Sequence, residues 1–113
     1  MQNKIRVFVV DDSIFFRQML IRDLQARSNI EVVGFAASAF EARTKIPSIK
    51  PDVITMDVEM PGLSGIDFLK ELLPKFPIPV ILVSSLNLSV FDALAAGAVD
   101  FVQKPDMSKD YSV

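Results

Sequence analysis

The fold of this chain is decided by the stretch Ile5-Arg6-Val7-Phe8-Val9-Val10-Asp11-Asp12, an apolar run closed by two carboxylates. A second run, residues 52–56, is closed by Asp57, and Lys104 follows a third run, residues 99–102. If these runs are parallel strands, their ends meet at the carboxyl edge of one sheet, where α/β proteins bind ligands. The sequence therefore predicts three acids and a lysine at one edge.

Acidic side chains gathered at a sheet edge repel one another and an incoming phosphate, unless a divalent cation joins them. Asp11, Asp12 and Asp57 with Mg²⁺ would form a metal-assisted phosphoryl site in which Asp57 can act as the nucleophile. Taken alone, each Asp also fits a turn former or a helix cap, as Asp12 beside Ser13 would. Their combination at successive strand ends favours the functional interpretation.

Composition narrows the class of protein. The 113 residues suit one domain, and half of them are hydrophobic, which excludes global disorder. With 12 Lys and Arg against 14 Asp and Glu, and no basic run, direct nucleic-acid binding is not expected. The absence of Cys and His excludes disulfides, thiolate or histidine metal sites and Ser-His-Asp hydrolases. A phosphohistidine, if one takes part, must belong to a partner.

The amino terminus predicts neither a signal peptide nor a membrane span. Only Val7 to Val10 run uninterrupted before two aspartates, which is too short for either. Because the lack of Cys also suits a reducing compartment, we expect a cytoplasmic protein without membrane insertion.

Short apolar runs alternate with helical patterns along the chain. The expected strands are residues 5–10, 30–35, 52–56, 80–83 and 99–102. The expected helices are about residues 14–27, 39–46, 65–73 and 90–96. Ser38, Ser64 and Ser89 each lead a helix in a capping-box layout, and Pro47 is expected to end the second helix. This alternation predicts a doubly wound parallel α/β sheet.

Four motifs at the strand ends carry a family resemblance. They are Val9-Val10-Asp11-Asp12-Ser13, Met56-Asp57-Val58-Glu59-Met60-Pro61-Gly62, Val83-Ser84-Ser85-Leu86 and Phe101-Val102-Gln103-Lys104-Pro105. Over about residues 4–106 the chain resembles a receiver domain of two-component response regulators. Within that family, the sequences of these motifs most resemble the amino-terminal receiver of chemotaxis protein-glutamate methylesterases. The resemblance implies a flavodoxin-like five-stranded sheet of order 2-1-3-4-5, already described for a chemotaxis receiver.

The resemblance also implies how the acids would act. Asp57 would be the phosphoacceptor, Asp12 a direct Mg²⁺ ligand, and Asp11 a ligand acting mostly through water. The backbone carbonyl of Glu59 would supply another oxygen to the ion, which prefers octahedral oxygen ligands. The ion would offset the repulsion between carboxylate and phosphoryl oxygens.

Three further strand-end residues receive roles from the resemblance. Lys104 and the Ser84 hydroxyl would bind phosphoryl oxygens, and Phe101 would be an aromatic switch that turns inward when Ser84 moves. The bond from Lys104 to Pro105 would be a cis peptide. The plainer interpretations are a solvated lysine, a serine in a turn and a core phenylalanine.

The expected domain covers residues 1–106, with residues 107–113 as the start of a linker or of a truncated last helix. Only eight residues follow Pro105, whereas a fifth helix needs roughly 10 or more, so that helix would be largely missing. Apolar strand surface, including Phe8 and Val102, would then lie exposed. We expect a homodimer through that face, or a longer parent that supplies the helix.

The leading functional hypothesis is a receiver that takes a phosphoryl group from a histidine kinase and switches its surface. The resemblance implies control of a methylesterase domain in a longer protein, and no independent enzyme here beyond self-phosphorylation and self-dephosphorylation. A Mg²⁺-dependent phosphohydrolase is disfavoured because Asp57-Val58-Glu59 is not Asp-x-Asp and no cap domain is present. Flavin or nucleotide binding would need a phosphate-binding loop where Asp11 and Asp12 stand. A scaffold receiver that is never phosphorylated is disfavoured by the intact chemical positions.

Overall fold

The computed structural model describes residues 3–85 and 90–105, and its strands form one parallel sheet. The strands are β1 (Ile5–Val10), β2 (Ile30–Ala36), β3 (Val53–Asp57), β4 (Val80–Ser84) and β5 (Asp100–Gln103). The helices are α1 (Ile14–Gln25), α2 (Ala39–Ile49), α3 (Gly65–Leu72) and α4 (Val90–Ala95). The sheet order β2-β1-β3-β4-β5, with every neighbouring pair parallel, confirms the predicted order.

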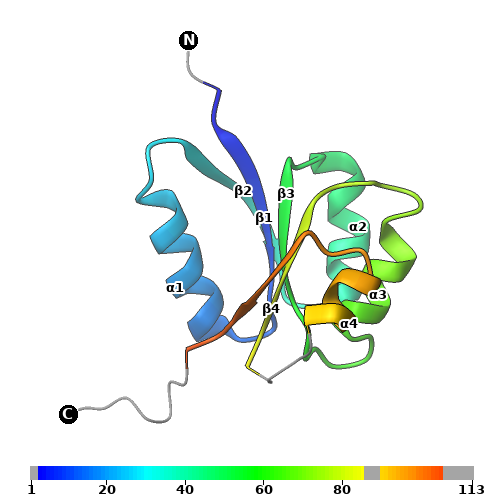
Figure 1. Cartoon of the computed structure of the whole chain (residues 1–113). Helices are drawn as coiled ribbons and strands as arrows, with labels where there is room; N and C mark the ends of the chain where they lie inside the picture. Colours follow the sequence, from blue (N-terminus) through cyan, green and yellow to red (C-terminus); the bar gives the residue numbers. More distant parts are fainter. Residues whose placement is uncertain (1–2, 86–89, 106–113) are drawn as a thin grey trace, which may run out of the picture.

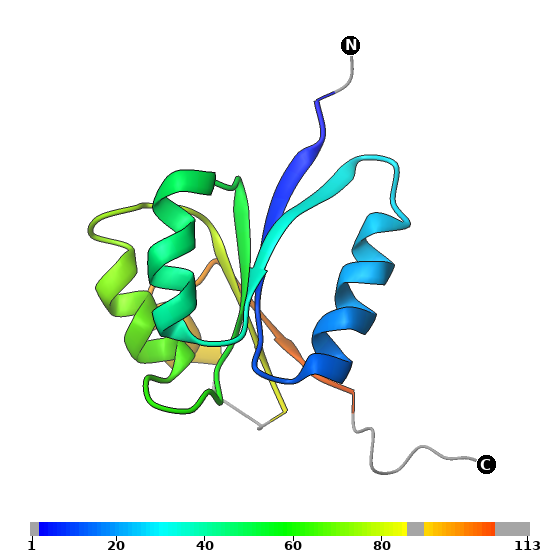
Figure 2. The same cartoon turned by 180° about the vertical axis from the view of Figure 1, so that it is seen from behind.

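The helices divide unequally between the two faces of the sheet. Figures 1 and 2 show α2, α3 and α4 together on one face and α1 on the opposite face. Such a division follows from right-handed crossovers on either side of the first strand. Among the described helices, α1 therefore covers its face alone.

The main core lies between the sheet and the layer of α2, α3 and α4. Phe8, Ile54 and Met56 project from β1 and β3 into this layer, where they meet Phe68 of α3, and all four are fully buried. Burying each such side chain contributes roughly 1.5–3 kcal/mol. β1 is buried at Val7–Val10 on successive residues, which is typical of a central strand covered on both faces.

The predicted serine caps are present where the structure describes them. Ser38 Oγ accepts the Glu41 amide at 3.1 Å, and Ser64 Oγ accepts the Asp67 amide at 3.2 Å. Glu41 in turn accepts the Ala37 amide at 2.6 Å, one residue before the capping serine. These bonds satisfy helix donors that would otherwise have no partner. Ser89 lies outside the described residues.

One predicted helix boundary is wrong, because α2 runs through Pro47 to Ile49. Pro47 stands in the last turn, where its missing N–H costs a single helix bond. The Arg6 guanidinium then donates to the carbonyls of Ile49 and Lys50 at 2.9 and 2.6 Å, and Lys50 closes the helix in the left-handed region. Besides this, α1 ends at Gln25 instead of residue 27, and the other expected bounds lie within one residue of those observed.

The expected exposure of strand surface is half right. Val102 on β5 is 49% exposed, as expected, whereas Phe8 is 0% exposed. The Phe8 prediction is wrong because this side chain faces the α2 side of the sheet, against Gly34 and the core cluster. The expected tail and the truncated fifth helix lie outside the described residues.

Gly65 ties the start of α3 to the end of β3. Its amide donates to the Val58 carbonyl at 2.9 Å, and a Cβ at this position would lie 2.1 Å from the carbonyl oxygen of Asp57. A contact that close forces the backbone that carries Asp57 to shift. Only glycine therefore fits where α3 approaches this strand.

We expect Gly65→Ala to lower the free energy of unfolding by about 3 kcal/mol or more, because backbone atoms must move to admit the methyl group. Gly34→Ala is the matched control, since its Cβ would meet the Ile49 and Phe8 side chains at 3.0 Å and no backbone atom that close. Urea denaturation of both variants measures the difference. An equal or smaller loss for Gly65→Ala would contradict this interpretation.

Candidate functional site

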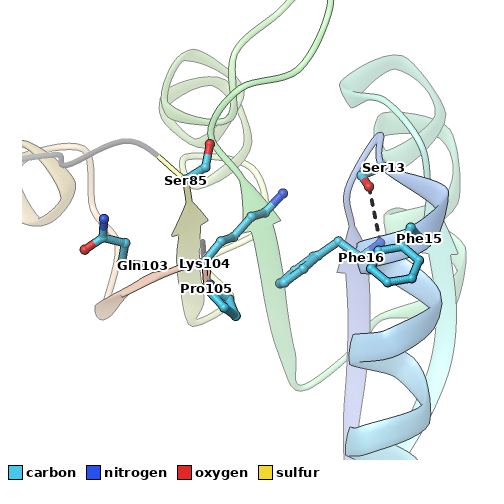
Figure 3. Close-up of a pocket in the computed structure, with 7 residues that line it drawn as sticks. All are labelled: Ser13, Phe15, Phe16, Ser85, Gln103, Lys104 and Pro105. Atoms are coloured by element: carbon cyan, nitrogen blue, oxygen red, sulfur yellow. Dashed lines mark hydrogen bonds between the residues drawn. The ribbon is translucent and has the colours of Figure 1, made fainter. Parts of the chain in front are cut away.

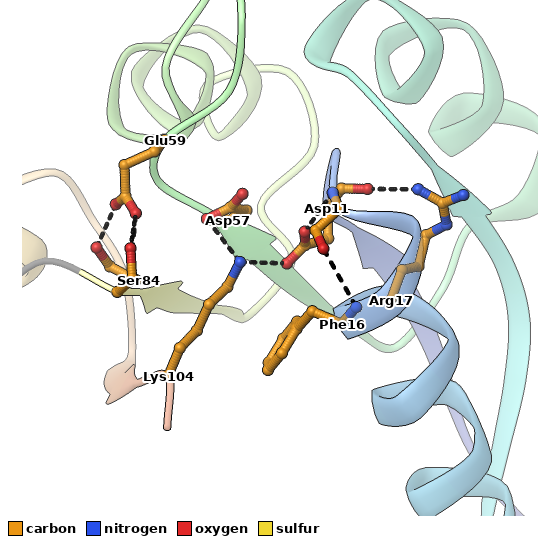
Figure 4. A network of polar contacts seen from close by, with 9 residues as sticks. Asp11, Phe16, Arg17, Asp57, Glu59, Ser84 and Lys104 are labelled. Atoms are coloured by element: carbon orange, nitrogen blue, oxygen red, sulfur yellow. Dashed lines mark hydrogen bonds and ion pairs between the residues drawn. The ribbon is translucent and has the colours of Figure 1, made fainter. Parts of the chain in front are cut away.

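The predicted site residues come together at the carboxyl edge of the sheet. Asp11 follows β1, Asp57 and Ser84 are the last residues of β3 and β4, and Lys104 follows β5. Figure 4 shows their side chains converging from these separate strands. The register keeps the strand ends level, because Val10 pairs with Met56 and Asp57 pairs with Val83.

Three carboxylates form a compact acid cluster. One oxygen each from Asp11, Asp12 and Asp57 lies within 4.8 Å of the others. Asp11 and Asp57 are 2% exposed, whereas Asp12 is exposed. Asp57 Oδ1 is buried, and its contact with a donor in the described part of the chain is the long 3.4 Å approach of Lys104 Nζ, so it keeps coordination capacity. This oxygen-only set fits a hard divalent cation such as Mg²⁺.

Without a metal ion, the surroundings of Asp57 disfavour its ionised form. Burial, followed by the charge of Asp11, raises its pKa to about 7, although the nearby Lys104 acts in the opposite direction. A divalent cation would reverse this balance by favouring the ionised carboxylate. The acid cluster is therefore arranged to take up positive charge.

Lys104 supplies part of that charge. Its Nζ lies 2.9 Å from Asp11 Oδ2 and 3.4 Å from Asp57 Oδ1, and only 12% of its side chain is exposed. Burial alone would lower the pKa of Lys104, but the hydrogen bonds and charges of Asp11 and Asp57 raise it above its ordinary value. The amine also lies 4.4 Å from the centre of the Phe16 ring. Lys104 is thus held as a cation, and the solvated-lysine interpretation is wrong.

Ser84 is fully buried and does not point its hydroxyl at Asp57. The hydroxyl donates to the Glu59 carboxylate, which also accepts from the hydroxyl and amide of Ser85 at 2.7 and 3.2 Å. Burial would raise the pKa of Glu59, but these bonds and Lys104 lower it. The Glu59 side chain therefore faces the end of β4 instead of the three aspartates, as Figure 4 shows. The predicted use of its backbone carbonyl stays a prediction.

The predicted roles of Phe101 and Pro105 have different outcomes. Phe101 is half-buried on β5 and packs against the core, and its switch role stays a prediction. The predicted cis peptide before Pro105 is wrong, because the described residues contain no cis bond. Trans is the lower-energy form of an X–Pro bond by about 0.5–1 kcal/mol.

Two supporting residues on α1 were not predicted from the sequence. Arg17 is 9% exposed, donates to the Asp11 carbonyl at 2.7 Å and lies 5.1 Å from the centre of the Phe35 ring. Phe16 packs beneath Lys104, as described above. The available signal was a single arginine inside an otherwise apolar helix start, because a charge placed there needs a partner when buried.

An open pocket borders the site at Lys104. It has a volume of about 460 Å³ and lies between the start of α1 and the end of β5 (Figure 3). Its lining consists of Ser13, Phe15, Phe16, Ser85, Gln103, Lys104 and Pro105. Lys104 therefore lines this pocket, whereas Asp11, Asp12 and Asp57 do not.

The family of the chain follows from comparison with known proteins. Residues 7–110 match the response regulator receiver domain. The chain belongs to this family. It is 53% identical to protein-glutamate methylesterase/protein-glutamine glutaminase 2 of Syntrophomonas wolfei, over 95% of this chain and 31% of that protein. It is 51% identical to the protein-glutamate methylesterase/protein-glutamine glutaminase of Syntrophotalea carbinolica, over 93% of this chain and 31% of that protein.

Solved structures agree with this assignment. The response regulator domain of Thermotoga maritima CheB is 47% identical, with a TM-score of 0.87 over 96% of this chain and 84% of that one. A chain of the Borrelia burgdorferi CheX-CheY-BeF3-Mg complex matches at 30% identity and a TM-score of 0.84, over 91% of this chain and 80% of that one. The chain is therefore a chemotaxis-type receiver domain, and it spans about a third of the length of its methylesterase relatives. In the described part of the receiver, no helix could cross a membrane.

The raised pKa of Asp57 predicts how stability depends on pH. Between its ordinary value of 3.8 and about 7, the folded receiver retains a proton that the unfolded chain releases. Without metal, this group therefore destabilises the fold increasingly as the pH rises through that range. We expect Asp57→Asn to be more stable than wild type at about pH 8 by about 1–3 kcal/mol, and nearly equal at about pH 4.

Urea denaturation with a chelator present measures both proteins at the two pH values. Asp23→Asn, an exposed position on α1, controls for the loss of one negative charge. A wild type as stable as Asp57→Asn at the higher pH would contradict the predicted cost of ionising Asp57.

Proposed function

We propose that this receiver accepts a phosphoryl group on Asp57 from a phosphohistidine of a partner kinase, in a Mg²⁺-dependent reaction. The main supporting observation is the buried Asp57 carboxylate, whose Oδ1 has only a long 3.4 Å contact with Lys104 among the described residues and which lies close to Asp11 and Asp12. Such a carboxylate is free to attack while its charge is balanced. The chain contains no histidine, so the donor histidine must come from elsewhere.

The reaction is an in-line displacement at phosphorus. An oxygen of Asp57 forms the new P–O bond while the P–N bond to the donor imidazole breaks, and the nitrogen keeps the electron pair. Asp11, Asp12 and Asp57 would hold the Mg²⁺, with the Glu59 carbonyl as a further ligand. When bound, the ion supplies positive charge to the transferring phosphoryl oxygens.

Two further side chains would bind the phosphoryl group. Lys104 already contacts Asp57 and needs only a small movement to reach a phosphoryl oxygen on it. Ser84 would donate its hydroxyl after turning away from Glu59. Phe101 would follow Ser84, because both lie where β4 and β5 pair. This movement would alter the outer surface that an output domain contacts.

The output would be a methylesterase domain in a longer protein. Support comes from the identity to methylesterases of which this chain covers about a third. A homodimer through the face around Val102 and a cytoplasmic location stay predictions. The phosphohydrolase alternative is weakened by the structure, because Glu59 points to Ser84 and Ser85 and offers Asp57 no second carboxylate as acid or base.

Phosphorylation by a small donor tests the proposed function. We expect wild type with Mg²⁺ and acetyl phosphate to gain one phosphoryl group by intact mass, and Asp57→Asn to gain none, because an amide is not a nucleophile here. Asp52→Asn, directly before the start of the same strand, is the matched control and should react like wild type. A gain that persists in Asp57→Asn would refute the assignment.

Metal binding should depend more on Asp12 than on Asp11. Asp11 already accepts from Lys104 and from the Ser13 amide, both at 2.9 Å, whereas Asp12 is exposed and open to a cation. Losing a direct carboxylate ligand lowers affinity more than losing a contact made through water, so we expect roughly 10–100-fold weaker Mg²⁺ binding for Asp12→Ala.

Calorimetric titration of Mg²⁺ into wild type, Asp12→Ala and Asp11→Ala compares the three affinities. Thermal melts without metal identify any loss that reflects unfolding. A folded Asp12→Ala that binds as tightly as Asp11→Ala would contradict the assignment of ligands.

A further inference from the structure

The carboxylate of Glu59 makes a two-sided contact with the end of β4. One oxygen accepts the Ser84 hydroxyl, and the other accepts the Ser85 hydroxyl at 2.7 Å and the Ser85 amide at 3.2 Å. Ser84 is fully buried and Glu59 is half-buried, so this contact is partly shielded from water. Hydrogen bonds to a charged acceptor are roughly twice as strong as neutral ones. The contact is therefore a strong link between the β3–α3 loop and β4.

This link uses the donor that phosphorylation would need. A phosphoryl group on Asp57 offers anionic oxygens, and the predicted donor to one of them is the Ser84 hydroxyl. A hydroxyl carries a single proton, so it cannot donate to Glu59 and to a phosphoryl oxygen together. The two anions, carboxylate and phosphoryl, must therefore compete for Ser84.

We propose that Glu59 is a positioning residue whose carboxylate holds Ser84 and Ser85 in the unphosphorylated arrangement, and that the phosphoryl group on Asp57 must displace it. This inference rests on the proposed function. The covalent step is the transfer already described, in which the P–O bond to Asp57 forms as the P–N bond of the donor breaks, and the displacement of Glu59 is an exchange of hydrogen bonds only. The strength of the Glu59 contact then sets how much of the receiver occupies the phosphoryl-binding arrangement.

Competition between Glu59 and the phosphoryl group for the serine donors can be distinguished from simple charge repulsion. Glu59 carries a negative charge near Asp57, and that charge alone would oppose an incoming anion. Competition further requires the bonds to the serines. Ser85→Ala removes one of those bonds and leaves the Glu59 charge in place. It is therefore the variant that distinguishes the two explanations.

Beryllofluoride with Mg²⁺ is the probe, because it mimics a phosphoryl group on a carboxylate and reports binding without turnover. We expect Glu59→Gln to bind it roughly tenfold more tightly than wild type, since a glutamine has one acceptor oxygen and no charge. Ser85→Ala should also bind more tightly, by a smaller factor. Glu71→Gln is the matched control, because Glu71 pairs with Arg43 on the surface and should bind like wild type.

Fluorine NMR titration of the four proteins, each shown to be folded by thermal melting, decides the matter. Tighter binding by Glu59→Gln with unchanged binding by Ser85→Ala would mean that charge repulsion acts alone, and it would overturn the competition. Equal or weaker binding by Glu59→Gln would overturn it as well, as would the same gain in Glu71→Gln. If wild type bound no beryllofluoride, the proposed function itself would fail.

Discussion

The ion pairs of Lys104 hold the carboxyl edge of this receiver together. Asp11 and Asp57 are both almost fully buried, and two such carboxylates close to one another cost several kcal/mol unless a cation joins them. Lys104 reaches them at 2.9 and 3.4 Å from beyond the end of β5. One side chain therefore ties the ends of β1, β3 and β5, and a sheet order with β5 elsewhere would leave both acids unpaired.

Two side chains of α1 contact the residues that form these ion pairs. Arg17 fixes the Asp11 carbonyl at 2.7 Å, and Phe16 lies beneath the Lys104 amine. Both residues lie in the first turn of α1, whose start is fixed by the Ser13 cap at the Phe16 amide. The loop that carries the acids is thus held at its backbone, which leaves the carboxylates to respond to charge. A rigid frame around a charged pair is the arrangement that catalysis by positioning requires.

The sequence allowed the sheet order and the site's strand-end residues to be predicted, because buried parallel strands are continuous apolar runs and their ends must share one edge. It did not reveal the direction of side chains that depend on tertiary partners. Phe8 could face either side of a strand buried on both faces. A proline ends most helices, but α2 continues past Pro47, and its last carbonyls accept from Arg6, which is 43 or more residues away in sequence. Glu59 could equally have faced the aspartates.

In the unphosphorylated site, the groups that would bind the phosphoryl oxygens already have partners within the receiver. Lys104 is bound to Asp11 and Asp57, and Ser84 is bound to Glu59, so every proposed phosphoryl-binding group has a carboxylate partner. A phosphoryl group therefore gains the Ser84 proton only by replacing Glu59, and it must share the Lys104 ammonium with Asp11 and Asp57. The net gain per bond is the difference between two similar interactions, which is small compared with either one. Two arrangements of nearly equal free energy are what a reversible switch requires, because a modest change at Asp57 can then shift the population from one to the other.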